Sequence, residues 1–375
     1  MLRFVDLAGV NLFKDFYMRV APPRLRREQT AEQRMVGGHG RAPKNPDPHA
    51  CMYVFCDLAC AAIDFGIIEY LVLASDEAIK RGLGQIHFVY VPAANDSYRI
   101  HGTPDPLPDE WRIQNILMQI PWLSPMCVGV TFCNTREQAA LFLKSVGDHI
   151  FPSDYSVEQI TDGMLSAHVS REIIGVNKGR DYRHIRATAS SKYYVQRWLD
   201  RYANGKLPVT LTLREGPRDV ERNSNLAAWV AFAKSLDSEI YCPIFVRDTE
   251  TYFGGVSQGR NQEDGSREIE KFVSFPEASL NLHARAALYE LSHVNLSVPV
   301  GPFSVCVYNK SVNYLGFRIV CENAYSTSEE YLNWLGMKKG ESYHFAGPSQ
   351  KLVWEDDTFE VISREFKNFQ DLISG

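Results

Sequence analysis

Short apolar runs alternate with longer amphipathic segments from about residue 51 onward. In the first part of the chain, strands are predicted at 51–58, 86–92 and 127–133, and helices at 61–82, 110–121 and 135–146. The predicted strands are apolar on both faces, which is typical of a parallel sheet covered by helices on each side. Gly82 is predicted to end the first helix and Thr135 to cap the third.

The alternation restarts after a less regular stretch at 150–190. Helices are predicted at 190–205, 225–236 and 282–294, strands at 209–213, 242–246 and 271–275, and the runs 304–308 and 317–321 continue the pattern. The sequence therefore predicts an α/β fold with two doubly wound, Rossmann-like parallel-sheet domains facing a cleft. In such sheets ligands bind at the carboxyl ends of the strands.

Four regions follow from this pattern. We expect an N-terminal helix and linker at 1–48, a first Rossmann-like domain at 49–170, a second Rossmann-like domain at 171–325, and C-terminal helices at 326–375 that pack across both domains. The two halves are expected to meet near 170–205. No repeat between them is detectable in the sequence.

The net charge of −5 is unevenly distributed. Residues 1–44 carry +5 and the remainder carries −10. An acidic body argues against a nucleic-acid-binding surface. It is compatible with an enzyme that places a few cations around one anionic ligand.

The eight cysteines include no Cys-x-x-Cys pair, and most fall in apolar, strand-like runs. We interpret them as small buried residues in a reducing cytoplasm. The stretch 1–20 is too polar for a signal peptide but could form an amphipathic helix. A helix packed on the body or on a partner is the simpler interpretation, and peripheral membrane contact is the alternative.

The stretch "VTLTLREGPRDVERNSN" loads the tip of a predicted strand with charges and amides. Arg214 follows the strand directly, and Arg222 precedes Asn223, Ser224 and Asn225, which can cap the next helix. Arginine forks and a helix N-terminus together would bind a phosphate. A cluster of salt bridges with an ordinary cap explains the same residues equally well.

Three other loops could carry chemistry. Asp248 and Glu250 follow the next strand, where an acid could accept ribose or base donors or simply cap the following segment. Gly301 and Ser304 lie on a turn that could contact a phosphate or be purely structural. Asp57, at the tip of the first strand, could be a general base, although helix capping is the favoured interpretation.

Several familiar motifs are missing. The chain has no Gly-x-Gly-x-x-Gly after a strand, no P-loop and no Gly-x-Ser-x-Gly elbow. Its histidines and acids show no metal-binding spacing. We therefore expect neither a cofactor nor a metal.

Taken in order, these motifs resemble the metal-independent glycosyltransferases of the GT-B type, most closely the fucosyltransferase-like branch. "VFCDLACAAIDFG" is similar to that branch's first strand and helix, "TLTLREGPRD" to its arginine motif, "IFVRDTE" to its next strand end and "VNLSVPVGPFSV" to its late turn. The resemblance spans about residues 50–325. It implies that the domain at 49–170 is the acceptor side and the domain at 171–325 binds the nucleotide sugar. It also implies that Arg214 binds the diphosphate of the nucleotide sugar, that Asp248 or Glu250 lies near the nucleotide and that Ser304 contacts phosphate.

The resemblance favours a GDP-sugar donor and leaves a glycan or other acceptor open. We expect Asp57 and Arg214 to be catalytic, and the donor to contact Arg214, Glu215, Arg222, Asn223, Ser224, Asn225, Asp248, Glu250, Gly301, Phe303 and Ser304. The sequence departs from the family because Glu215 follows Arg214 where a second arginine is expected, and Gly301-Pro302 replaces a serine pair. An inactive member, a non-catalytic nucleotide- or sugar-binding protein and a sugar-nucleotide epimerase are the alternatives.

Overall fold

A computed structural model describes residues 47–61, 63–93, 109–158, 166–216, 219–249 and 266–374. The N-terminal segment 1–46, with its predicted helix, lies outside these residues. The first domain contains a parallel sheet of order β3-β2-β1-β4. Its strands are β1 (Asp47–Asp57), β2 (Leu83–Val91), β3 (Cys127–Phe132) and the two-residue β4 (Ile150–Phe151).

The second domain contains a six-stranded parallel sheet of order β10-β9-β8-β5-β6-β7. Its strands are β5 (Leu207–Thr212), β6 (Tyr241–Val246), β7 (Val273–Ser274), β8 (Val294–Ser297), β9 (Tyr314–Gly316) and β10 (Gln350–Leu352). From β7 to β10 this is the order 3-2-1-4-5-6 of a doubly wound sheet, in which the winding direction reverses between the first and fourth strands. The predicted fold class is confirmed.

Helices cover both faces of each sheet. They are α3 (Ile67–Arg81), α4 (Asp109–Arg112), α5 (Arg136–Ser145), α6 (Ser166–Arg171), α7 (Ala189–Tyr202), α8 (Leu226–Ser235), α10 (Ser266–Ile269), α11 (Glu277–Leu280), α12 (Leu282–Leu291), α13 (Ser304–Val307), α14 (Glu329–Leu335) and α15 (Phe359–Ser374). Gly82 ends α3 with a positive φ of 73°, and the Thr135 side chain accepts a hydrogen bond from Gln138 N at the start of α5, both as predicted.

Some local predictions are wrong. The run 110–121 is only partly α-helical, because the π-helix η3 (Ile113–Leu117) and the 3₁₀-helix η4 (Ile120–Leu123) follow α4. Residues 304–308, for which the pattern allowed a helix or a strand, contain the short helix α13 (Ser304–Val307). Residues 317–321 form no strand, because the sheet strand lies just before them at β9 and a second, unpredicted strand, β10, pairs with it.

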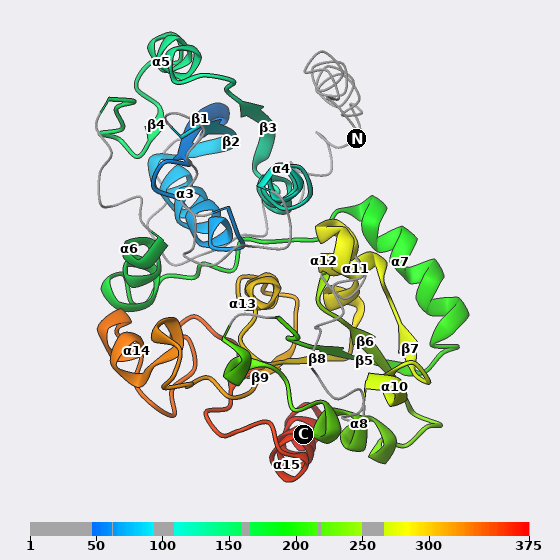
Figure 1. The fold of residues 1–375 in the computed structure, drawn as a ribbon. Helices are drawn as coiled ribbons and strands as arrows, with labels where there is room; N and C mark the ends of the chain where they lie inside the picture. The colour runs from blue at the N-terminus through cyan, green and yellow to red at the C-terminus, as the bar shows by residue number, and fades with distance from the viewer. Residues whose placement is uncertain are drawn as a thin grey trace, which may run out of the picture.

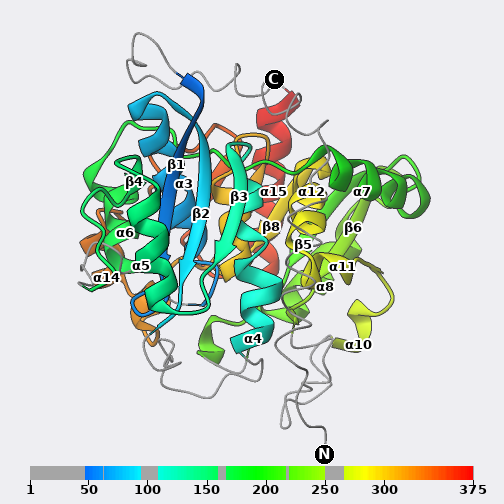
Figure 2. The same cartoon turned by 90° about the horizontal axis from the view of Figure 1, so that it is seen from above.

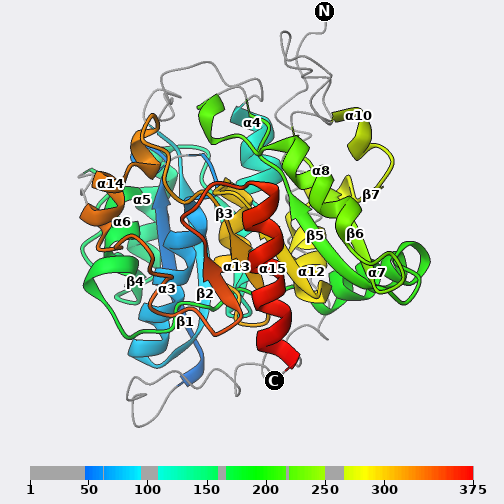
Figure 3. The same ribbon diagram turned by 90° about the horizontal axis from the view of Figure 1, so that it is seen from below.

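The apolar core is layered (Figure 1). One cluster lies between the outer face of the four-stranded sheet and α5, and another lies between the six-stranded sheet, α8 and α15. Figure 2 shows α5 beside the first sheet from above, and Figure 3 shows α8 and α15 beside the second sheet from below. The largest cluster lies between the two sheets and is shared by both domains.

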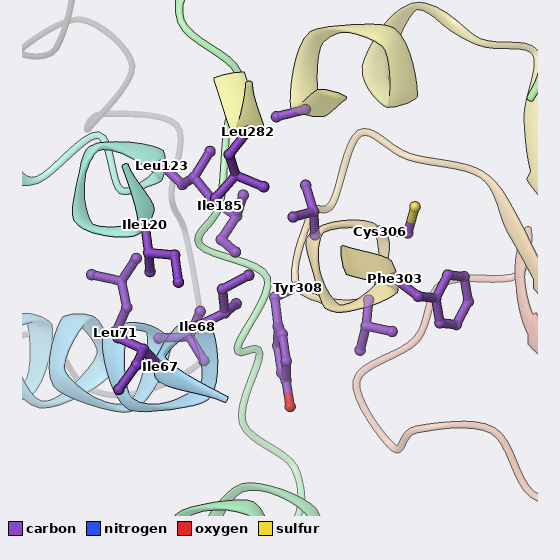
Figure 4. Close-up of a cluster of buried hydrophobic side chains, with 14 of the residues drawn as sticks. Ile67, Ile68, Leu71, Ile120, Leu123, Ile185, Leu282, Phe303, Cys306 and Tyr308 are labelled. Atoms are coloured by element: carbon purple, nitrogen blue, oxygen red, sulfur yellow. The ribbon is translucent and has the colours of Figure 1, made fainter. Parts of the chain in front are cut away.

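The junction between the domains is apolar and closely packed. Figure 4 shows residues of α3 and η4 facing the start of α12 and the region of α13, and the ten labelled residues are at most 6% exposed: Ile67, Ile68, Leu71, Ile120, Leu123, Ile185, Leu282, Phe303, Cys306 and Tyr308. The connecting chain passes through this core, with Tyr182 and Ile185 fully buried. A large apolar interface of this kind favours a fixed arrangement of the two domains.

Candidate functional site

The carboxyl edge of the six-stranded sheet gathers most of the predicted site residues. β5 and β8 are neighbours in this sheet, and the winding reverses between them. Arg214 lies two residues beyond β5, and Gly301 and Ser304 lie just beyond β8. Asp248 follows β6, the neighbour of β5 on its other side. This is the position at which doubly wound sheets bind ligands.

Arg214 is held in place by the loop that follows it. Its Nη1 donates to Asn223 Oδ1 at 2.8 Å, and its backbone N–H donates to Ser224 Oγ at 2.9 Å. Asn223 Nδ2 donates to the carbonyl of Gly216 at 2.9 Å. The guanidinium also lies over Gly216, where an added Cβ would come within 3.2 Å of Nη1. The loop therefore fixes the direction of the guanidinium before any ligand arrives.

Glu215 bonds to two residues at the end of the neighbouring strand β6. Its carboxylate pairs with Arg247, with the closest contact at 2.5 Å, and its backbone N–H donates to Asp248 Oδ2 at 2.8 Å. Burial raises the pKa of Asp248, and this effect is opposed by the Glu215 N–H and by the positive charges of Arg285 and Arg214. Asp248 is thus a partly buried acid that accepts a hydrogen bond from the backbone of the loop after β5.

Arg222 joins the loop after β5 to the turn after β8. Its Nη2 donates to the carbonyl of Pro299 at 3.3 Å, and its Nη1 contacts Asp219 and Ser326, each at 3.4 Å. These long contacts leave Arg222 loosely held in comparison with Arg214. The ion pair between Arg222 and Asp219 fits the interpretation of these loop charges as a cluster of salt bridges.

The turn after β8 packs against the other domain. An added Cβ at Gly301 would meet the ring of Phe65 at 2.7 Å, so only glycine permits this approach. Ser304 Oγ donates to the carbonyl of Gly301 at 2.6 Å, and Phe303 is buried. Phe65 lies in the loop between β1 and α3, so the carboxyl edges of the two sheets meet here.

The N-terminus of α8 carries a carboxylate from the chain itself. Asn225 Oδ1 accepts from Ala228 N at 3.3 Å, as its predicted capping role requires. Asp357 Oδ2 accepts from Asn225 N at 2.8 Å and from Trp229 Nε1 at 2.6 Å, and Asp357 Oδ1 pairs with Arg318 at 2.7 Å. The expectation that this helix end supplies unoccupied N–H groups for a phosphate needs correction, since Asp357 already balances part of its positive charge.

Arg285 is a charged residue at this edge that the sequence analysis missed. It lies on α12 and is only 3% exposed. Its Nε donates to the carbonyl of Ala278 at 2.5 Å and its Nη1 donates to Tyr289 Oη at 3.1 Å. The signal was present as one arginine in the apolar stretch "LHARAALYEL".

Asp57 lies at the corresponding edge of the first sheet and is completely buried. Arg136 forms a bidentate pair with it at 2.9 and 2.8 Å, and Tyr155 Oη donates to Oδ2 at 3.0 Å. Its Oδ1 also accepts from Ala59 N at 3.0 Å. Asp57 does not cap α3, because Gly66 is the N-cap and no side chain bonds there. Both oxygens are already occupied, which does not suit a general base.

Some expected features lie outside the described residues or away from this edge. Glu250 is outside them. Among the described residues, no cluster of His, Cys, Asp and Glu is arranged to hold a metal ion. Cavities of about 760 Å³ on α7 and about 300 Å³ between α3 and α6 are lined by no predicted site residue.

All eight cysteines are described and none forms a disulfide. None of the described helices has the length and hydropathy needed to cross a bilayer.

No known protein family matches the sequence, and no curated protein matches it either. The structure is similar to the E. coli ADP-heptose LPS heptosyltransferase II, at 9% identity and a TM-score of 0.47, over 87% of this chain and 100% of that one. It is also similar to a family 9 glycosyl transferase of Veillonella parvula, at 9% identity and a TM-score of 0.43, over 74% and 82% of the two chains.

A third similar structure is the NodZ α-1,6-fucosyltransferase crystallised with GDP, at 12% identity and a TM-score of 0.32, over 71% and 94% of the two chains. These three solved structures are a heptosyltransferase, a family 9 glycosyl transferase and a fucosyltransferase. Because such low identities and TM-scores are compatible with many substrates, function has to be judged from the site itself.

Proposed function

We propose that the chain is a metal-independent glycosyltransferase that binds a nucleotide-diphosphate sugar where the winding of the six-stranded sheet reverses. The observation that supports this proposal is the position of Arg214. It follows β5 at the reversal point, and the adjacent loop fixes its guanidinium. A planar guanidinium held in this way suits the bidentate recognition of a phosphate.

In the proposed reaction, the bond between the sugar C1 and the diphosphate oxygen breaks, and an acceptor hydroxyl oxygen bonds to C1. The acceptor proton leaves to a base or to water. Negative charge develops on the departing diphosphate, and Arg214 stabilises it, with Arg222 nearby on the same loop. We assign Asp248 and Glu250 to the nucleoside. We assign Ser304, Gly301 and Phe303 to the phosphates.

A GDP-sugar is the first donor to test, because the motifs resemble the fucosyltransferase-like branch. We assign the contacts of Asn223, Ser224 and Asn225 to loop positioning, since their side chains bond within the chain. Glu215 positions Asp248 through its backbone. We do not assign the role of general base to Asp57, because Arg136 and Tyr155 occupy its carboxylate oxygens.

That same pairing favours a second candidate function, nucleotide-sugar binding without turnover. A binding screen against GDP, UDP, ADP and CMP sugars, followed by product analysis, separates the two. Release of the nucleotide with transfer or hydrolysis of the sugar supports the enzyme, and binding with no product supports the binding protein. A sugar altered while still attached to its nucleotide would identify an epimerase, and no binding of any nucleotide would overturn the proposal.

A further inference from the structure

We propose that Arg285 and Asp248 form a donor–acceptor pair that binds the nucleobase of the donor and sets the base preference of the site. This inference rests on the proposed function, and it assigns to Arg285 a role that the sequence motifs do not indicate. It concerns the uncharged part of the nucleotide, and it leaves the diphosphate to Arg214.

The first step is the unusual state of Arg285. A buried guanidinium is costly unless ion pairs and hydrogen bonds compensate for lost hydration. Arg285 is 3% exposed, yet no carboxylate among the described residues forms an ion pair with it. Its two hydrogen bonds, to Ala278 O and Tyr289 Oη, use two of its five N–H groups.

The second step is the position of the guanidinium. Tyr289 Oη, which accepts from Arg285, lies 2.9 Å from Thr212 Oγ1. Thr212 is the last residue of β5, two positions before Arg214. These bonds place Arg285 beside the carboxyl end of β5, at the edge of the sheet that carries Arg214 and Asp248.

The third step is the relation between Arg285 and Asp248. Arg285 donates to the carbonyl of Ala278, and the next residue, Ser279, donates to the carbonyl of Arg247 and accepts from Thr249, on either side of Asp248. Arg285 and Asp248 are therefore neighbours, yet they form neither an ion pair nor a hydrogen bond with each other. The positive charge of Arg285 opposes the rise that burial causes in the pKa of Asp248. The hydrogen bond of Asp248 within the chain is to Glu215 N, through Oδ2. A hydrogen-bond donor and an acceptor of opposite charge are therefore close to each other without contact.

The fourth step concerns the ligand. A cation and an anion held as a pair are neutral together, so they match an uncharged group that presents an acceptor beside a donor. The edge of a nucleobase is such a group, whereas a diphosphate would be repelled by Asp248. Buried polar groups of this kind discriminate strongly, because a ligand that lacks the matching atoms leaves them unpaired.

The test measures the affinity of the full chain for four nucleoside diphosphates (guanine, uracil, adenine and cytosine) and for inorganic pyrophosphate. Arg285→Met should weaken the tightest nucleoside diphosphate by at least about tenfold and flatten the ranking of bases, while pyrophosphate affinity stays the same. Arg214→Ala should weaken both ligands. Arg201→Met, on the exposed surface of α7, is the matched control and should change neither.

Because Arg285→Met leaves Asp248 without its nearby cation, the double variant Arg285→Met, Asp248→Asn keeps the test valid if the single variant unfolds. It removes both charges and should show the same flattened ranking in a protein with a normal melting profile. An unchanged base ranking, or equal weakening of pyrophosphate and nucleotides, would overturn the inference while leaving the proposed function intact. If the unaltered chain binds no nucleotide and no pyrophosphate, both proposals fail.

Discussion

The two sheets reverse their winding in the same way but treat the reversal point differently. In the first sheet, β1 and β4 flank that point, and the buried Asp57 there is paired with Arg136 and Tyr155. In the second sheet, β5 and β8 flank it, and Arg214 there bonds to an amide, Asn223. The first point is closed by a buried carboxylate, an arginine and a tyrosine that bond to one another, whereas the second carries two arginines, Arg214 and Arg222, on the loop after its strand.

This difference suggests a structural role for the reversal point of the first sheet and a ligand-binding role for that of the second. A buried ion pair with all partners present contributes to a unique structure and offers a ligand nothing to bind. The two arginines of the second point put positive charge at a strand end, where an anionic ligand can bind. The two domains then need not move far apart, because the shared core around α3, α12 and α13 joins them.

The largest expected effect comes from breaking the closed point. Asp57→Ala leaves Arg136 without its carboxylate and should destabilise the protein by about 3–5 kcal/mol, the usual result of removing one partner of a buried pair. Urea unfolding at pH 7 measures this. The double variant Asp57→Ala, Arg136→Met should lose less than the sum of the single variants. If Asp57→Ala costs less than about 1 kcal/mol, the first reversal point is not structural.

The second effect concerns the joint stability of both regions at acid pH. Burial lowers the pKa of His184, in the connecting segment, and of His283, on α12, to about 4 each. The pKa of each histidine in the unfolded chain is near 6.5, so between pH 4 and pH 6.5 the unfolded chain binds more protons than the folded chain. The contribution of each is fully present above about pH 6.5 and falls by roughly 3 kcal/mol as the pH drops to 4.

Urea unfolding between pH 7 and 4 checks this prediction, with fluorescence reporting the first domain and the second. His283→Gln should flatten part of the pH dependence. Since the domains share one core, both probes should show a single transition. Two separate transitions would contradict the picture of a fixed junction.

The third effect tests the open point. Arg214→Ala should leave folding nearly intact and weaken nucleoside diphosphate binding by roughly 1.5–3 kcal/mol, the range for hydrogen bonds to charged groups. Arg214→Lys should restore only part of it, because a point charge replaces a planar fork. Calorimetric titration provides the measurement, and equal affinity in the Arg214→Ala variant would remove the main support for the proposed function.

The sequence predicted most of the fold because its signals were local. Gly82, Thr135 and the apolar runs each determine structure within a few residues. The apolar runs were enough to predict two parallel sheets. The errors fell where tertiary contacts decide. The strand β10 has only three residues and exists through its pairing with β9, and the predicted helix at 110–121 is interrupted by a π-helix and a 3₁₀-helix.

The site was predictable only in part. Arg214 and Asp248 could be found, since residues after parallel strands gather at one edge. The partners of these residues could not, because they are remote in the chain. Arg136 lies 79 residues from Asp57, and Asp357 lies 132 residues from Asn225. No periodicity or spacing relates such pairs. The burial of Arg285 likewise depends on tertiary packing, which one arginine in a helical run does not reveal.

The smallest effect separates loop structure from ligand binding at the open point. Asn225 Oδ1 caps α8, so Asn225→Ala should cost about 1 kcal/mol of stability, the typical value for losing an N-cap. Its effect on nucleoside diphosphate affinity should stay below about twofold, because Asp357 already occupies that helix end and Arg214 is fixed by Asn223 and Ser224. Thr135→Ala, which removes the corresponding cap of α5 in the first domain, is the matched control and should cost a similar amount without affecting binding. If Asn225→Ala weakens binding as much as Arg214→Ala does, the N-terminus of α8 takes part in phosphate recognition after all, and the contrast between a cation site and a structural helix end is wrong.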